Sequence, residues 1–272
     1  PAYLVPHLRK TLWLVHQYRQ AYDLYDAGQT NLPDGQVGTD LRHLIKTADN
    51  ECFQGARRIF SISDVTQKRL TKYNGFASDV LRAPINDPEL FAGGPSEGYV
   101  FAGGRVNAAK RQHLLLEALA LAPKNVRLVI AGPPDSMADA TRLHETMERL
   151  GLKDRVRLDL RFLERREYAA WVNGAAAVAS LPFDEESFSY VAMEAATAGK
   201  ALISTTDSGG VLGLAKHHET GWVAEPRPEA LAAALGAVYA VPKRTADFGA
   251  AARACWTGHN ITWPATVGAL LS

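Results

Sequence analysis

The sequence predicts an α/β protein whose strands form parallel sheets, and two observations carry this prediction. First, short apolar runs alternate with longer helical patterns from about residue 98 onward, which is typical of consecutive βαβ units. Second, the chain has 272 residues, 47% of them hydrophobic, which is enough for about two domains with a large buried core.

The alternation is complete in the second part of the chain. Strands are predicted at Tyr99–Ala102, Asn125–Ala131, Val156–Leu160, Ala175–Leu181, Ala201–Thr205 and Trp222–Ala224. Helices are predicted at Ala108–Leu121, after Pro134 up to Leu150, at Glu164–Val172, around Tyr190–Ala198 and at Pro228–Val238. Residues 91–260 are therefore expected to form a complete Rossmann-like domain.

The first part of the chain, residues 1–90, contains fewer elements. Strands are predicted at Leu12–Val15, Arg57–Phe60 and Val80-Leu81, and helices at Asp40–Thr47 and Val65–Tyr73. Two or three strands make half of a doubly wound sheet, which leaves an exposed strand edge. The Gly- and Pro-rich stretch 84–98 is predicted to be a linker, and residues 261–272 an amphipathic helix that packs back on the first part.

Composition and charge exclude several classes of protein. The 30 basic and 29 acidic side chains leave a net charge of +1, so no strong field recruits nucleic acid or an anionic membrane. The two cysteines, Cys52 and Cys255, are too few and too far apart for a metal framework. Apolar runs fall far short of the roughly 20 residues that span a bilayer. Because the chain starts without Met and without a signal peptide, we expect a soluble protein or the C-terminal part of one.

Ligands of open parallel sheets bind at the carboxyl ends of the strands, so candidate site residues are expected at these positions. The first strand of the second domain is followed by Gly104 and Arg105, with Lys110 five residues further on. Glycine lets a ligand approach the backbone, and two cations suit a phosphate group. A glycine turn with two solvated cations explains the same residues equally well.

An acidic loop follows the fourth strand of this domain and ends in Glu186, and Ser187 or Ser189 is the expected N-cap of the next helix. The free backbone N–H groups of that helix end favour an anion. Glu194 lies eight residues after Glu186, or about 12 Å along a continuous helix. Glycoside hydrolases hold their carboxylates about 5 to 9.5 Å apart. Unless Glu186 folds back, the spacing therefore favours two separate hydroxyl contacts on a polyol ligand. The alternative interpretation is that Glu194 is a charge on a solvated helix face, but its neighbours Ala192, Met193, Ala195 and Ala196 predict a mostly buried helix and make that alternative less favoured.

These residues also carry a family resemblance. Together with the runs 130–132, 207–210 and 219–223, they occur in the order and at the intervals of the donor domain of retaining family 4 glycosyltransferases of the GT-B fold, which residues 98–240 resemble. The runs 14–23 and 59–63 are similar to the end of that family's acceptor domain. The resemblance implies that residues 1–90 are the C-terminal part of an acceptor domain whose start is missing. It further implies that residues 91–260 form the nucleotide-sugar donor domain and that residues 261–272 form a helix that packs back on the first.

The resemblance implies roles for individual residues. Arg105 and Lys110 would hold the donor diphosphate and stabilise it as leaving group, and Glu186 would contact the transferred sugar. Backbone N–H groups at Phe188 and Ser189 would cradle phosphate. The implied catalytic residues are Arg105, Lys110 and Glu186. The implied substrate-binding residues are Gly104, Gly132, Pro133, Leu163 at the base, Ser187, Phe188, Ser189, Glu194 at the ribose, and His16, which otherwise is structural.

The implied activity is metal-independent, retaining transfer of a hexose from a GDP- or UDP-sugar to a saccharide or glycolipid, with neither cofactor nor nucleic acid. The sequence contains no Asp-x-Asp and no cluster with metal-ligand spacing. The family's habits further imply a cytoplasmic enzyme of polysaccharide biosynthesis, with any peripheral membrane contact made by the missing N-terminal region.

The sequence departs from the family pattern at three positions. Gly213 stands where an acidic residue is usual, and Arg161 and Ser189 stand where glycine is common. These departures leave open a slow enzyme or an altered donor preference. They also leave open an inactive relative that binds a nucleotide-sugar or a partner protein. A nicotinamide-dependent oxidoreductase is a further alternative, but its G-x-G-x-x-G fingerprint is absent after every predicted strand. An epimerase of the same fold is another alternative, and it differs from a glycosyltransferase in the chemistry of the acceptor side.

Overall fold

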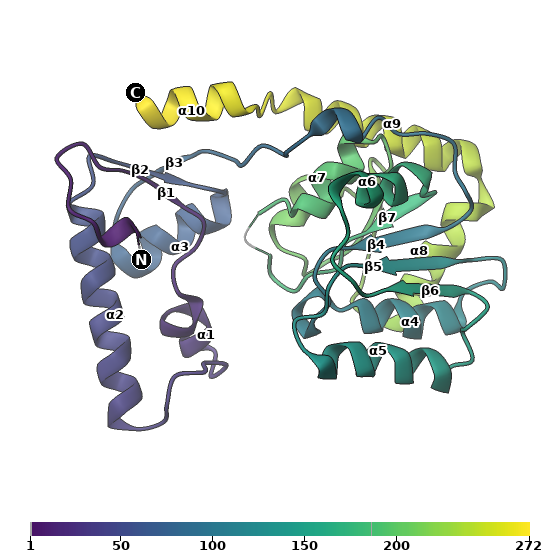
Figure 1. The fold of residues 1–272 in the computed structure, drawn as a ribbon, viewed down its shortest axis with the longest axis horizontal. Helices are drawn as coiled ribbons and strands as arrows, with labels where there is room; N and C mark the ends of the chain where they lie inside the picture. Colours follow the sequence, from purple (N-terminus) through teal and green to yellow (C-terminus); the bar gives the residue numbers. More distant parts are fainter. Residues whose placement is uncertain (1, 186) are drawn as a thin grey trace. The chain divides into compact units, whose positions relative to one another are not determined.

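The structure is a computed structural model that describes residues 2–185 and 187–272. It contains two compact units (Figure 1). The larger unit comprises Ile85–Asn260, and the smaller unit comprises Pro1–Pro84 together with Ile261–Ser272.

The larger unit is built on a six-stranded sheet in which every pair of neighbours is parallel. Its strands are β4 (Val100–Gly103), β5 (Leu128–Ala131), β6 (Val156–Asp159), β7 (Ala177–Ala179), β8 (Ala201–Thr205) and β9 (Gly221–Ala224). The order across the sheet is β6-β5-β4-β7-β8-β9, so the winding direction reverses between β4 and β7. This arrangement confirms the predicted Rossmann-like domain.

Helices cover both faces of this sheet (Figure 1). They are α4 (Gln112–Leu121), α5 (Met137–Arg149), α6 (Arg165–Gly174), α7 (Tyr190–Thr197), α8 (Pro228–Ala240) and α9 (Pro242–Gly258). α4 packs against α5 and α8, and α7 packs against α9 and α6. The strands β5, β7 and β8 are buried along their whole length because helices cover both faces of the sheet, and Ile130 and Ile203 are at 0% exposure.

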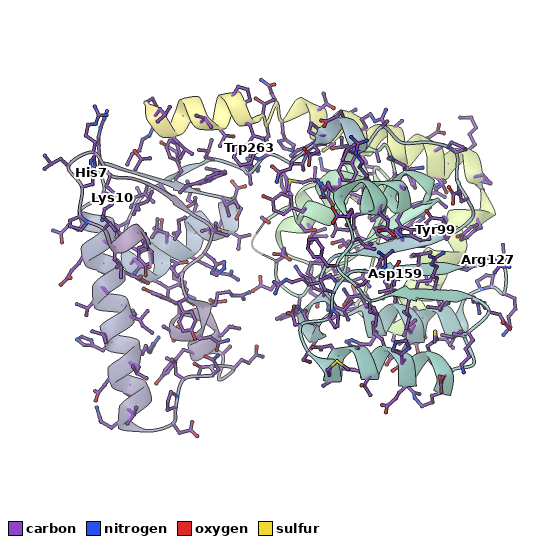
Figure 2. The ribbon with its side chains drawn as sticks, in the orientation of Figure 1. His7, Lys10, Tyr99, Arg127, Asp159 and Trp263 are labelled. Atoms are coloured by element: carbon purple, nitrogen blue, oxygen red, sulfur yellow. The ribbon has the colours of Figure 1, made fainter. Side chains whose placement is uncertain are left out.

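The smaller unit contains a three-stranded parallel sheet of β1 (Thr11–Leu14), β2 (Arg58–Ser61) and β3 (Asp79–Val80), in that order. Its α-helices are α1 (Asp23–Asp26), α2 (Gln36–Gln54), α3 (Asp64–Asn74) and α10 (Trp263–Leu271). β1 lies at the edge of this sheet, as the half-sheet pattern predicts. α10 begins at Trp263, which is labelled in Figure 2. α10 packs against β1, where the ring of Trp263 meets that of Trp13 edge-on at 6.3 Å between centroids.

The segment predicted to be a linker is instead packed into the larger unit. Ile85 and Phe91 are buried at 4% and 1% exposure. The backbone N–H of Gly93 donates to Oδ1 of Asn173 at 2.9 Å, and that of Glu97 donates to the carbonyl of Gly174 at 2.8 Å. The Gly and Pro content suggested a linker, but the two large apolar side chains decide the packing because their burial removes them from water.

Candidate functional site

The neighbouring strands β4 and β7 end at a cleft of about 40 Å³ in the larger unit. Its lining includes Gly104, Arg105, Lys110, Ser180 and Ser189. The cleft lies where the winding direction of the sheet reverses, which is the usual position of a ligand in this class of fold. The structure therefore brings four of the predicted site residues together, and Ser180 joins them.

Glycines keep the edge of the sheet free of side chains. Gly104 has φ +95°, and Gly132 has φ +138° with its Cα so close to the carbonyl of Gly104 that a β-carbon would overlap it. Beside them, the carbonyl of Pro133 accepts from the N–H of Val106 at 2.9 Å, which ties the loop after β5 to the loop after β4. A ligand at this edge therefore meets backbone groups directly.

The two predicted phosphate-binding cations each contact a carboxylate. Arg105 lies 3.2 Å from Asp135, and its side chain is 66% exposed. Lys110 pairs with Glu185, and its side chain is 32% exposed. The Arg105 pair is exposed and contributes little to stability, so Arg105 can exchange its carboxylate for a phosphate at small cost. The Lys110 pair is partly buried, because the Glu185 side chain is 16% exposed.

Arg111 organises the loop between β7 and α7, and the sequence analysis did not single it out. Its guanidinium donates to both carboxylate oxygens of Asp207 at 2.8 Å, to Thr205 Oγ1 at 2.8 Å, and to the carbonyls of Leu181 at 2.7 Å and Pro182 at 3.0 Å. The Arg111 side chain is 13% exposed. The neighbouring Arg111 lowers the pKa of Asp207 below its ordinary value.

The first turn of α7 faces the same cleft. Ser189 is the N-cap, and its Oγ accepts a long hydrogen bond of 3.4 Å from the N–H of Ala192. Its backbone has φ +60° and ψ 137°, a conformation that favours glycine, the residue common here in the family. The N–H of Ser189 donates to Ser187 Oγ at 3.3 Å, so a phosphate bound at this N–H would replace that bond.

Phe188 explains the departure at Gly213. The Phe188 side chain is buried, and its ring lies so close to Gly213 that any β-carbon at position 213 would overlap it. The ring of His259 packs against the same phenyl ring, with 5.1 Å between centroids. An acidic residue at position 213 is therefore sterically incompatible with this position of Phe188.

The Glu194 side chain lies inside the larger unit, with 4% of its surface exposed. Its Oε1 accepts from Nη1 of Arg165 at 2.5 Å. Burial raises the pKa of Glu194, while Arg165 and the Tyr168 hydroxyl oppose that shift. The solvated-face interpretation of Glu194 is wrong, because the small neighbours that the sequence places around it let α7 pack closely on β7, β8 and α9.

Two further predicted residues, Leu163 and His16, do not line the cleft between β4 and β7. Glu186 lies outside the described residues. Leu163 is buried at 8% exposure, whereas its neighbour Phe162 is 78% exposed. His16 belongs to the smaller unit, where its Nδ1 lies 2.6 Å from the Gln17 carbonyl beside a cavity of about 550 Å³.

Arg161 stands where the family often has glycine, and it forms ion pairs with two carboxylates. Its guanidinium lies 2.8 Å from Asp159, at the end of β6 (Figure 2), and also pairs with Glu167.

Among residues 2–185 and 187–272, no group of three or more His, Cys, Asp or Glu side chains could hold a metal ion. In the same described part of the chain, no helix has both the length and the apolarity to cross a bilayer.

The fold and its cleft belong to the class of α/β proteins in which a parallel sheet binds a ligand at the carboxyl ends of its strands. The fold matches that of glycosyltransferases of the GT-B type. The family model described as glycosyl transferases group 1 matches residues 93–254, which is more than half of the chain. The chain belongs to this family.

Individual relatives agree with the family. A D-inositol 3-phosphate glycosyltransferase of Mycolicibacterium gilvum is 33% identical over 184 residues, which cover 65% of this chain and 39% of that protein. The first curated relatives are matched over about 40% of their own length. The crystal structure of Anabaena HepE in complex with UDP-glucose has a TM-score of 0.73 at 22% identity, covering 86% of this chain and 66% of that one.

The chain also resembles a solved structure that consists of a C-terminal domain. The C-terminal domain of a glycosyl transferase group 1 family protein from Francisella tularensis has a TM-score of 0.56 at 17% identity. It covers 65% of this chain, and 98% of that domain is matched. The likeness to these two solved structures supports the fold.

Proposed function

We propose that this chain carries the donor site of a retaining glycosyltransferase, which transfers a hexose from a GDP- or UDP-sugar to a saccharide or glycolipid acceptor without a metal ion. One observation carries the proposal: the cleft between β4 and β7 joins a bare glycine edge at Gly104 to the two cations Arg105 and Lys110. Glycine allows close approach of a phosphate to the backbone, and the cations match its charge.

The chemistry follows from the charges. As the bond between sugar and diphosphate breaks, the leaving group gains about one negative charge. Lys110 and Arg105 would stabilise that charge once phosphate replaces Glu185 and Asp135 as their partner, and loss of one such donor typically costs about 10²–10³ in rate. Glu186 would contact the transferred sugar, and the acceptor would attack on the face that the leaving group departs from.

The nucleotide half of the donor would lie nearer to Glu194. A carboxylate accepts hydrogen bonds from two neighbouring ribose hydroxyls, and Glu194 belongs to the helix that begins at the cleft. UDP is the first nucleotide to test, because HepE was crystallised with UDP-glucose and UDP. The smaller unit would belong to the acceptor side, so full transfer is proposed for a protein that holds both domains.

Calorimetric titration of the chain with UDP, GDP and NADH tests the proposal. We expect saturable binding of one nucleoside diphosphate, lost in Arg105→Ala and in Lys110→Ala. Arg149→Ala is the matched control, because Arg149 is an exposed cation at the end of α5. Binding of NADH alone, or undiminished binding in the Arg105 and Lys110 variants, would refute the proposal. A turnover assay with the matching nucleotide-sugar then distinguishes an enzyme from an inactive relative that only binds.

A further inference from the structure

Arg165, the first residue of α6, is held by the larger unit on three sides. Its Nη1 donates to Glu194 Oε1 at 2.5 Å, and its Nη2 donates to the carbonyl of Asn86 at 2.8 Å. Its guanidinium lies over the ring of Phe91, 4.6 Å from the centroid. These contacts fix the guanidinium in one orientation, since its planar fork cannot satisfy them in another.

The contact with Glu194 engages only one side of that carboxylate. No described residue donates a hydrogen bond of standard geometry to Glu194 Oε2. Beside the carboxylate lies the buried hydroxyl of Tyr168, which is close enough to lower the pKa of Glu194 but makes no well-aligned hydrogen bond within the described residues. The same hydroxyl occupies the space that a side chain on Gly103 would need, so this polar pair lies beside the end of β4. Buried polar groups normally have partners, and a hydroxylated ligand would supply both.

The charged and titratable groups near Glu194 are few. Arg165 and Tyr168 of α6 face the carboxylate, and Asp87 faces Arg165, with 3.7 Å between its carboxylate and Nε. From α9, the other helix packed on α7, Arg253 reaches the carbonyl of Ala92 instead. Arg165 is therefore the cation that offsets the burial of this carboxylate.

We infer that Arg165 is a positioning residue of the donor site: it anchors the Glu194 carboxylate through Oε1 in its charged form and leaves Oε2 to accept from the ribose hydroxyls of a nucleoside diphosphate. The inference rests on the proposed function and names a residue that acts through Glu194. Because Arg165 also binds the Asn86 carbonyl, it couples this carboxylate to the segment that enters the larger unit.

The test measures UDP binding between about pH 5 and pH 8 for wild type, Arg165→Met, Arg165→Lys and Glu194→Gln, in the whole chain. Arg166→Met is the matched control, since Arg166 is the next residue of α6 and is exposed. Without the cation, burial raises the pKa of Glu194 further. As the pH is lowered, Arg165→Met should therefore lose its affinity for UDP at a higher pH than wild type does. The expected loss is about tenfold for each unit by which that pKa exceeds the working pH. Arg165→Lys restores part of the affinity, and Arg166→Met behaves as wild type.

A loss of affinity that is uniform across this pH range, or no rescue by Arg165→Lys, means a merely structural role and overturns the inference. If Glu194→Gln binds UDP weakly while Arg165→Met binds UDP as wild type does, the inference about Arg165 is overturned and the proposed function is not. Unchanged binding by Glu194→Gln, or no binding of UDP or GDP by wild type, overturns the ribose site of the proposed function as well. A carboxyl NMR titration of Glu194 without nucleotide gives an independent check: the Glu194 pKa must be higher in Arg165→Met, and an unchanged pKa refutes the inference.

Discussion

Arg111 and Asp207 form a bidentate ion pair between the loop before α4 and the loop after β8, with both oxygen contacts at 2.8 Å. The two residues are 96 positions apart in the sequence. Through its further bonds to Leu181 and Pro182, Arg111 also fixes the loop that leads to the candidate site.

Replacing Arg111 is expected to destabilise the larger unit. Arg111→Met leaves the Asp207 carboxylate and two carbonyls without their donor, and breaking a partly buried, hydrogen-bonded pair in this way costs about 2–3 kcal/mol. Arg111→Lys should recover only part of the loss, because an ammonium cannot reproduce the planar fork. Urea unfolding of the three proteins measures the effect, and equal unfolding midpoints would contradict it.

The same pair predicts a pH dependence of stability. Arg111 lowers the pKa of Asp207 in the folded chain, so the contribution of this carboxylate is fully present above its unfolded pKa of about 3.9. It is lost as the pH falls through the lower, folded pKa. The difference in free energy of unfolding between wild type and Asp207→Asn should therefore be constant near neutrality and shrink below about pH 4. A difference that grows on acidification would show the opposite sign.

Ser189→Gly should stabilise the protein. The conformation at φ +60° and ψ 137° strains a residue with a side chain, at a cost of order 1–3 kcal/mol, whereas glycine adopts it freely. The cap lost with the hydroxyl is a long one, and glycine replaces a serine cap at a cost of only a few tenths of a kcal/mol. We expect a net gain of about 1 kcal/mol in urea unfolding. Ser187→Gly is the control, since Ser187 is not among the residues with positive φ, and an equal gain there would argue against relief of strain.

Restoring the family's acidic residue at position 213 should be unfavourable in this chain. Gly213→Glu forces its β-carbon into the ring of Phe188, and such overpacking costs about 1–3 kcal/mol. The penalty should fall when Phe188→Ala removes the ring, because the two positions are in contact. A double-mutant cycle on the unfolding free energy measures this coupling, and additive effects would exclude the clash as the cause.

The fold could be predicted because the hydrophobic alternation is local and each βαβ unit carries its own pattern. For the same reason, Gly104, Arg105 and Lys110 could be assigned to one strand end. The contacts of Arg111 and Arg165 could not be predicted, since their partners lie 29 to 96 residues away and no local spacing marks them. The role of Glu186 stays a prediction.

The packing of the segment before β4 shows a different limit. Its glycines and prolines are typical of a linker, but Ile85 and Phe91 are buried. Local composition describes how freely a segment bends, whereas its position depends on where its apolar side chains find a surface. Only the folded larger unit provides that surface.

The pairing of Arg105 with Asp135 and of Lys110 with Glu185 bears on how fast the proposed donor would arrive. Each cation already has an opposite charge beside it, so the cleft projects little net positive potential into the surrounding water. Long-range attraction then contributes little to the encounter with a diphosphate, and the association rate constant should change only weakly with ionic strength. Selectivity for the anion would arise after the encounter, when the carboxylates give way at contact distance.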